Sequence, residues 1–113
     1  MKMLDFNAIE KPTWPIKLKD EKQTVVTLST PTVELVDRLI ALTPDLEAIA
    51  KTKDGNTVRK VYELVADLIN CNEDGFAVTA EALRAVYKMQ LIDLILFAAG
   101  YMQFVKEMNN AKN

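Results

Sequence analysis

The chain has 113 residues, of which 50% are hydrophobic and 27% charged, and its formal net charge is −2. This length and composition predict one globular domain, and the lack of a basic surplus argues against nucleic acid as a partner. The single cysteine, Cys71, cannot form an intramolecular disulfide, so we expect a reducing cytoplasm and a Cys71 that packs as a small apolar residue.

The N-terminal part of the chain predicts an arm followed by a β-hairpin. Residues 1–14 have no clear period, and their prolines favour extended conformations. Residues 15–28 predict the hairpin, because Ile16–Lys19 alternates apolar and basic residues and Thr24–Leu28 is rich in β-branched ones, with a polar turn between them. A hairpin alone is only marginally stable, so one face must pack on helices, and Trp14 is the obvious residue to make that contact.

Helical periodicity dominates residues 31–109. Thr30 is the expected N-cap of the first helix, with Pro31 at its first position, where the missing N–H costs nothing. The pair Thr43–Pro44 repeats this start signal. It predicts either a second short helix or a kinked continuation of the first, ending near Lys51.

Loop and turn signals divide the middle of the chain into separate helices. A loop is predicted at Asp54–Thr57, followed by a strongly amphipathic helix that ends near Asn70. A turn is predicted at Asn72–Gly75, and Thr79 is expected to cap another helix. With the last helix, these elements predict a single α+β domain, mainly α, in which a short N-terminal β-hairpin packs on four to five helices.

The last helix, predicted from about Gln90 to Asn109, is long and apolar around most of its circumference. Its strongest membrane candidate, the nine residues of Leu94–Met102, falls short of the roughly 20 needed to span a bilayer. The start of the chain also lacks the apolar run of a signal peptide, so no membrane partner is expected. Residues 110–113 are a polar tail that is expected to fray.

One side of this helix is a candidate protein-binding surface. Its aromatic residues recur at i, i+4 and i+7 and therefore share a face. Such a stripe is either core or part of an interface, in an oligomer or with another protein, since a helix apolar on all sides needs cover from several directions. The candidate binding residues on this side are Leu94, Phe97, Tyr101, Phe104, Val105 and Met108.

Gly100 lies inside the same helix, where glycine costs about 1 kcal/mol relative to alanine. Two explanations are open. Either the glycine permits a close helix crossing in the core, or it marks a place where the backbone of a partner approaches.

No residue pattern points to catalysis. The chain contains no histidine, which excludes Ser-His and Cys-His nucleophiles and removes the commonest general base and metal ligand. Glu73–Asp74 could suggest a cation loop, but the alternating ligands of an EF-hand are missing, so a plain turn is the preferred interpretation. We therefore expect no catalytic, cofactor-binding or metal site and no enzymatic activity.

The order and spacing of four segments resemble the tail assembly chaperones of Gram-positive siphophages and prophages. The hairpin and helix start WPIKLKDEKQTVVTLSTPT is followed by the helix VRKVYELVADLIN and, after a turn, by VTAEAL. The most characteristic segment is the closing LIDLILFAAGYMQFVKEM, in which the Phe…Tyr…Phe spacing precedes Lys-Glu.

The resemblance implies a non-enzymatic role in the bacterial cytoplasm, without a cofactor. Such chaperones bind the long tape measure protein, keep it soluble until the tail tube polymerises around it, and are then released. Self-association is also expected. Two other readings remain: a small oligomeric virion protein, such as a head–tail connector or tail terminator, and a small enzyme or ligand-binding module.

Overall fold

The computed structural model describes residues 1–6, 11–52 and 55–110. These residues form a small, mainly helical α+β fold with an N-terminal hairpin, as predicted, and with four helices. In chain order the elements are β1 (Trp14–Lys17), β2 (Val25–Leu28), α1 (Val33–Thr52), α2 (Gly55–Ile69), α3 (Ala80–Ala85) and α4 (Leu91–Asn110). The predicted tail beyond residue 110 lies outside the described residues.

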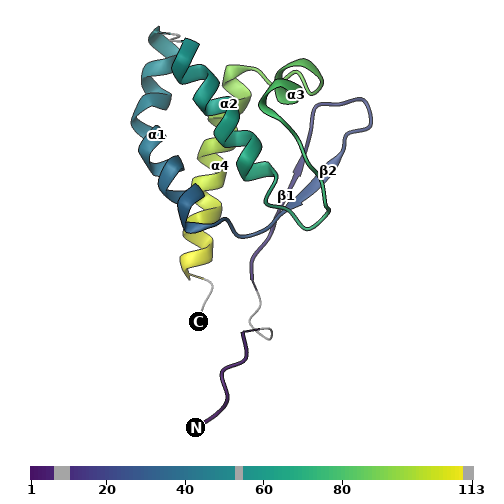
Figure 1. Cartoon of the computed structure of the whole chain (residues 1–113), viewed down its shortest axis with the longest axis vertical. Coiled ribbons are helices and arrows are strands. Elements are labelled where there is room, and N and C mark those ends of the chain that lie inside the picture. The colour runs from purple at the N-terminus through teal and green to yellow at the C-terminus, as the bar shows by residue number, and fades with distance from the viewer. Residues whose placement is uncertain (7–10, 53–54, 111–113) are drawn as a thin grey trace.

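β1 and β2 form an antiparallel hairpin that lies beside the helices (Figure 1). β1 begins with Trp14, which pairs with Leu28, so the strand starts one residue before the predicted hairpin. The turn is closed by Asp20, whose carboxylate accepts hydrogen bonds from the backbone N–H of Thr24, at 2.8 Å, and from the Thr24 hydroxyl. Leu28 and Val26 are fully buried, which shows that the inner face of β2 packs on the helices.

α1 differs from the prediction at its N-terminus. Its N-cap is Thr32, whose hydroxyl oxygen accepts a hydrogen bond from the Leu35 N–H at 3.3 Å; Thr30 and Pro31 precede the helix. Pro44 lies inside α1, so the continuation of the first helix, one of the two alternatives left open by the sequence, is the one observed. A proline inside a helix removes one backbone hydrogen bond and crowds the preceding turn, and the packing of α1 on α2 offsets this cost.

α2 begins at Gly55, within the predicted loop, so residues 55–57 belong to the helix. Loop-forming residue types are tolerated there because the first turn of a helix needs no intrahelical N–H partners. α2 packs against α1, α3 and α4 and lies in front of α4 in Figure 1, so its apolar face is at the centre of the fold. Its buried side chains are Val61, Tyr62, Leu64, Val65, Ala66, Leu68 and Ile69.

Polar side chains fix the connection from α2 to α4. The turn at residues 72–75 is organised by Asn72, whose amide donates to the carbonyl oxygens of Ile69 and Phe76 at 2.8 and 2.7 Å. Thr79 caps α3 as predicted, since its hydroxyl oxygen accepts from the Ala82 N–H at 3.1 Å. These bonds orient the chain that leads into α4, which runs behind α2 in Figure 1.

Candidate protein-binding surface

The aromatic side of α4 is covered by the chain itself. Trp14 of β1 stacks on Phe97, with ring centroids 5.5 Å apart and planes inclined by 21°. Its ring also lies 6.1 Å from Tyr101 and 6.0 Å from Phe104. Four of the six candidate binding residues belong to the buried core: Leu94, Phe97, Tyr101 and Phe104. The other two, Val105 and Met108, are half-buried and pack against that core.

Gly100 provides the space for Trp14. A Cβ atom at this position would lie 2.7 Å from Cη2 and 2.9 Å from Cζ2 of the indole, closer than the 3.5–4.0 Å of ordinary carbon contacts. The close approach expected at Gly100 is therefore made by a side chain of the hairpin, and not by the backbone of a crossing helix. Trp14 makes the contact to the helices that the sequence predicted.

The hydroxyl of Tyr101 is an unusual feature of this core. The residue is fully buried, and its oxygen has no hydrogen-bond partner among the described residues. Burial raises the pKa of Tyr101 far above its ordinary value, and the nearby Cys71 adds to the effect. An unpartnered buried hydroxyl costs stability, so the ring of Tyr101 holds its place through apolar packing.

The opposite side of α4 is an uncovered apolar stripe, which we call the α4 open face. It consists of three exposed apolar residues, Ile92, Leu96 and Ala99, followed by the exposed polar residue Gln103, at spacings of i, i+4, i+7 and i+11. Ile92 is 57% exposed and Leu96 is 63% exposed. The helix carries no charged residue from Leu94 to Val105, so the open face is uncharged along its length.

The candidate binding residues predicted from the sequence lie on the other side of the helix. Ile92, Leu96 and Ala99 also recur at i, i+4 and i+7, so the sequence does contain a signal for a second apolar side of the helix. The aromatic residues have the same spacing and larger side chains, which makes their side the more conspicuous candidate. A helix apolar nearly all round does not reveal which side its own chain will cover.

Both outer edges of the hairpin are poor docking sites for an added strand. On β2, Thr27 is already used: its N–H donates to the Asp74 carboxylate at 2.6 Å, and its carbonyl oxygen accepts from the Glu73 N–H at 3.0 Å. In an antiparallel pair the backbone groups of alternate residues point away from the partner strand. On β1 these residues are Pro15 and Lys17, and Pro15 has no N–H to donate to an added strand. The α4 open face is thus a better docking surface than the hairpin edges.

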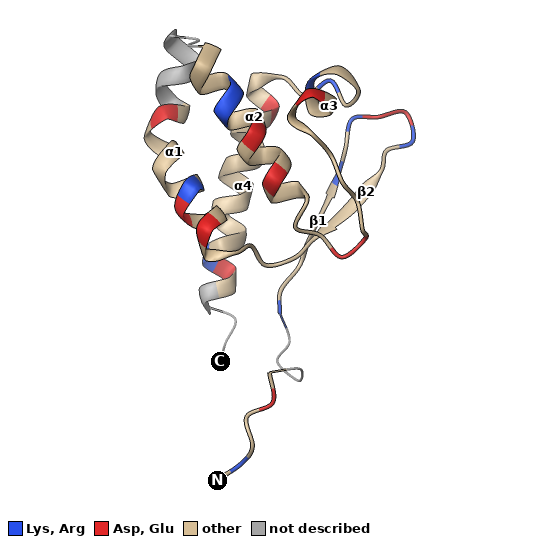
Figure 2. Ribbon diagram, in the orientation of Figure 1, with Lys and Arg blue, Asp and Glu red and all other residues tan. Residues whose placement is uncertain are grey.

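Charged residues gather on other surfaces. Figure 2 shows them along α1, α2 and α3, whereas the middle of α4 carries none. Arg38 of α1 and Asp67 of α2 form an ion pair at 2.8 Å, at the exposed side of the contact between these helices. The open face of α4 therefore lacks the charges that α1 and α2 carry, although α1 also exposes the apolar side chains of Val33 and Ile40.

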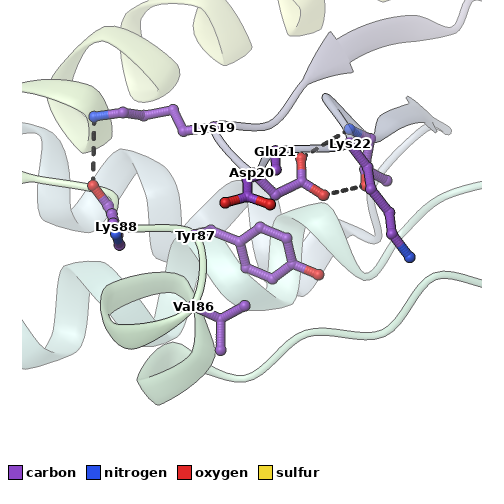
Figure 3. Close-up of a pocket in the computed structure, with 8 residues that line it drawn as sticks. Lys19, Asp20, Glu21, Lys22, Val86, Tyr87 and Lys88 are labelled. Carbon is purple, nitrogen blue, oxygen red and sulfur yellow. Dashed lines mark hydrogen bonds between the residues drawn. The ribbon is translucent and has the colours of Figure 1, made fainter.

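An open pocket of about 490 Å³ lies between the hairpin turn and the segment before α4 (Figure 3). Several of its polar groups are paired within the chain. The Lys19 ammonium donates to the Asp93 carboxylate at 2.9 Å and to the Lys88 carbonyl oxygen at 3.4 Å. The hydrogen bonds from Thr24 lower the pKa of Asp20. These contacts join the hairpin turn to the start of α4, which is a structural role.

Other kinds of site have little support in the described part of the chain. Asn72 and Asp74 bond to backbone groups of their own turn and of β2, as expected for a plain turn. Within residues 1–6, 11–52 and 55–110, no three Cys, Asp or Glu side chains gather to hold a metal ion. No helix in these ranges has the length and hydropathy to cross a membrane.

No family model, curated protein or solved structure matches this chain.

Proposed function

We propose that this chain is a phage or prophage tail assembly chaperone, a non-enzymatic protein that binds the tape measure protein in the host cytoplasm and keeps it soluble until the tail tube covers it. The α4 open face is the observation that carries the proposal, because it exposes Ile92, Leu96 and Ala99 on an uncharged helix face that a client helix can cover. The segments that resemble this chaperone family also support it.

The client contact is placed on the open face rather than on the aromatic side of α4. Trp14 already fills the space over Phe97 and Gly100, so a client could reach the aromatic residues only by displacing the hairpin. Leu96 is accessible without any rearrangement. A tape measure helix with its own apolar stripe can pack along the open face, ridge into groove.

The proposal is tested by co-expressing the chain with the product of the largest neighbouring gene, followed by affinity capture. We expect the native chain to hold the long helical partner in the soluble fraction and Leu96→Glu to lose it, since a charge would be buried in the contact. Ile40→Glu is the matched control, because Ile40 lies on α1 with a similar exposure of 55% and should leave capture unchanged.

Three results would contradict this account. The partner could be soluble without the chain and not be captured, or Leu96→Glu could capture it as well as the native chain does. Recovery of the chain from purified finished particles would instead favour a structural protein of the virion.

A further inference from the structure

The segment Met1–Phe6, which we call the apolar arm, exposes four large apolar side chains: Met1, Met3, Leu4 and Phe6. Leu4 is 69% exposed and Phe6 is 71% exposed. The arm lies beyond the C-terminal end of α4 in Figure 1, away from the body of the fold. Removing these side chains from water would be favourable, and the nearest uncovered apolar surface is the α4 open face.

The arm is tethered at the border of this face. The chain that follows the arm leads into Trp14, whose ring lies on Gly100. Gly100 follows Leu96 by four residues and precedes Gln103 by three, so it neighbours both on the helix surface. The eight steps from Phe6 to Trp14 can span up to about 27 Å, whereas a helix is only about 10 Å across. The arm can therefore reach the open face of its own chain.

The spacing of side chains on the arm matches that on the open face. In an extended chain Leu4 and Phe6 point to the same side, about 6.6 Å apart. On α4, Ile92 and Leu96 lie about 6 Å apart along the axis, from four steps of about 1.5 Å. Ala99, about one turn beyond Leu96, is exposed and small, so it leaves room for the ring of Phe6.

We propose that the apolar arm folds back onto the open face of its own α4, with Phe6 over Ala99 and Leu4 beside Leu96. The short connection keeps the arm at a high effective concentration next to this face. Ordering the arm costs conformational entropy that offsets much of the gain from burial, so the docked conformation exchanges with the extended one. The inference concerns a single chain without a client and does not rest on the proposed function. A client that binds the same face would have to displace the arm.

Nuclear Overhauser effects in the purified, isotope-labelled chain, without a client, test the docking. We expect contacts from the ring protons of Phe6 to the methyl groups of Leu96 and Ala99, unchanged on dilution because they lie within one chain. The contact to Ala99 should be lost in Leu96→Glu and kept in Ile40→Glu, since Ile40 is similarly exposed but lies on α1. Circular dichroism would verify that both variants remain folded, as expected for exposed positions.

A mixture of labelled and unlabelled chains distinguishes the arm of the same chain from the arm of a second copy. Filtered spectra of this mixture report only contacts between different copies, and we expect none from the arm. The proposal is overturned if the Phe6 ring shows no contact with α4, or if its contacts form between different copies. Persistence of the contact to Ala99 in Leu96→Glu, or its loss in Ile40→Glu, would overturn it as well.

Discussion

The contact between Trp14 and Gly100 gives the sharpest test of how the hairpin is held on α4. In Gly100→Ala the new methyl group would lie 2.7 and 2.9 Å from two indole carbons, so the ring must retreat by roughly 1 Å to reach a normal separation. Such overpacking costs about 1–3 kcal/mol, and the better helix propensity of alanine returns about 1 kcal/mol. We expect the free energy of unfolding to fall by up to about 2 kcal/mol.

Urea denaturation followed by circular dichroism measures this change. Gly55→Ala is the matched control, because Gly55 is also helical but has nothing within 4 Å of an added Cβ. The free energy of unfolding of this variant should equal that of the native chain or be slightly higher. The chain has one tryptophan, so a shift in its fluorescence in Gly100→Ala would report the movement of the ring directly.

A double-mutant cycle separates the clash from other effects of the methyl group. In a Trp14→Ala background the obstacle is gone, so Gly100→Ala should now stabilise the chain, by up to about 1 kcal/mol. The reasoning is refuted if Gly100→Ala stabilises the native chain as much as it stabilises the Trp14→Ala variant. It is also refuted if the destabilisation persists at full size without the Trp14 ring.

Two further predictions concern polar groups. Tyr101→Phe removes a buried hydroxyl that has no partner among the described residues, so the free energy of unfolding should be unchanged or rise by about 1 kcal/mol. Tyr62→Phe should instead lose about 1 kcal/mol in the same denaturation assay, because the Tyr62 hydroxyl donates to the Met89 carbonyl oxygen at 2.6 Å; equal effects would contradict the assignment. The hydrogen bond from the Gln90 backbone N–H is the main cause that lowers the pKa of Asp93 below its ordinary 3.8, and Lys19 adds to it. The ionised Asp93 therefore stabilises the folded chain at neutral pH, and this contribution is lost as the pH falls through the folded pKa. Asp93→Asn should therefore be less stable than the native chain at neutral pH and lose that difference in acid, and a difference that did not depend on pH would argue against this role.

Local sequence signals were sufficient for most of the fold. The alternation and polar turn of the hairpin, the periodicity of α2 and the cap at Thr79 all correspond to observed elements. The N-cap of α1 was predicted wrongly because two neighbouring positions offer the same signal: Thr30 and Thr32 are both possible N-caps, and Thr32 is the one that caps the helix. At Pro44 the sequence left a second helix and a continuation of the first both open, and the structure has the continuation.

The candidate surface was harder to predict, because it depends on which neighbours cover α4. Trp14 and Gly100 were each conspicuous in the sequence, yet only tertiary packing shows that one fills the space left by the other. Once the hairpin occupies the aromatic side, the apolar residues left outside are those around Leu96. Periodicity alone could not distinguish these two sides, since both have helical spacing and apolar residues.

Aggregation of the tape measure protein is the most direct measure of the central claim. The protein from the largest neighbouring gene would be diluted from denaturant, and its light scattering followed with and without this chain. The account predicts that the native chain suppresses aggregation at stoichiometric amounts and that Leu96→Glu does not. Scattering that the native chain leaves unchanged would contradict the chaperone function.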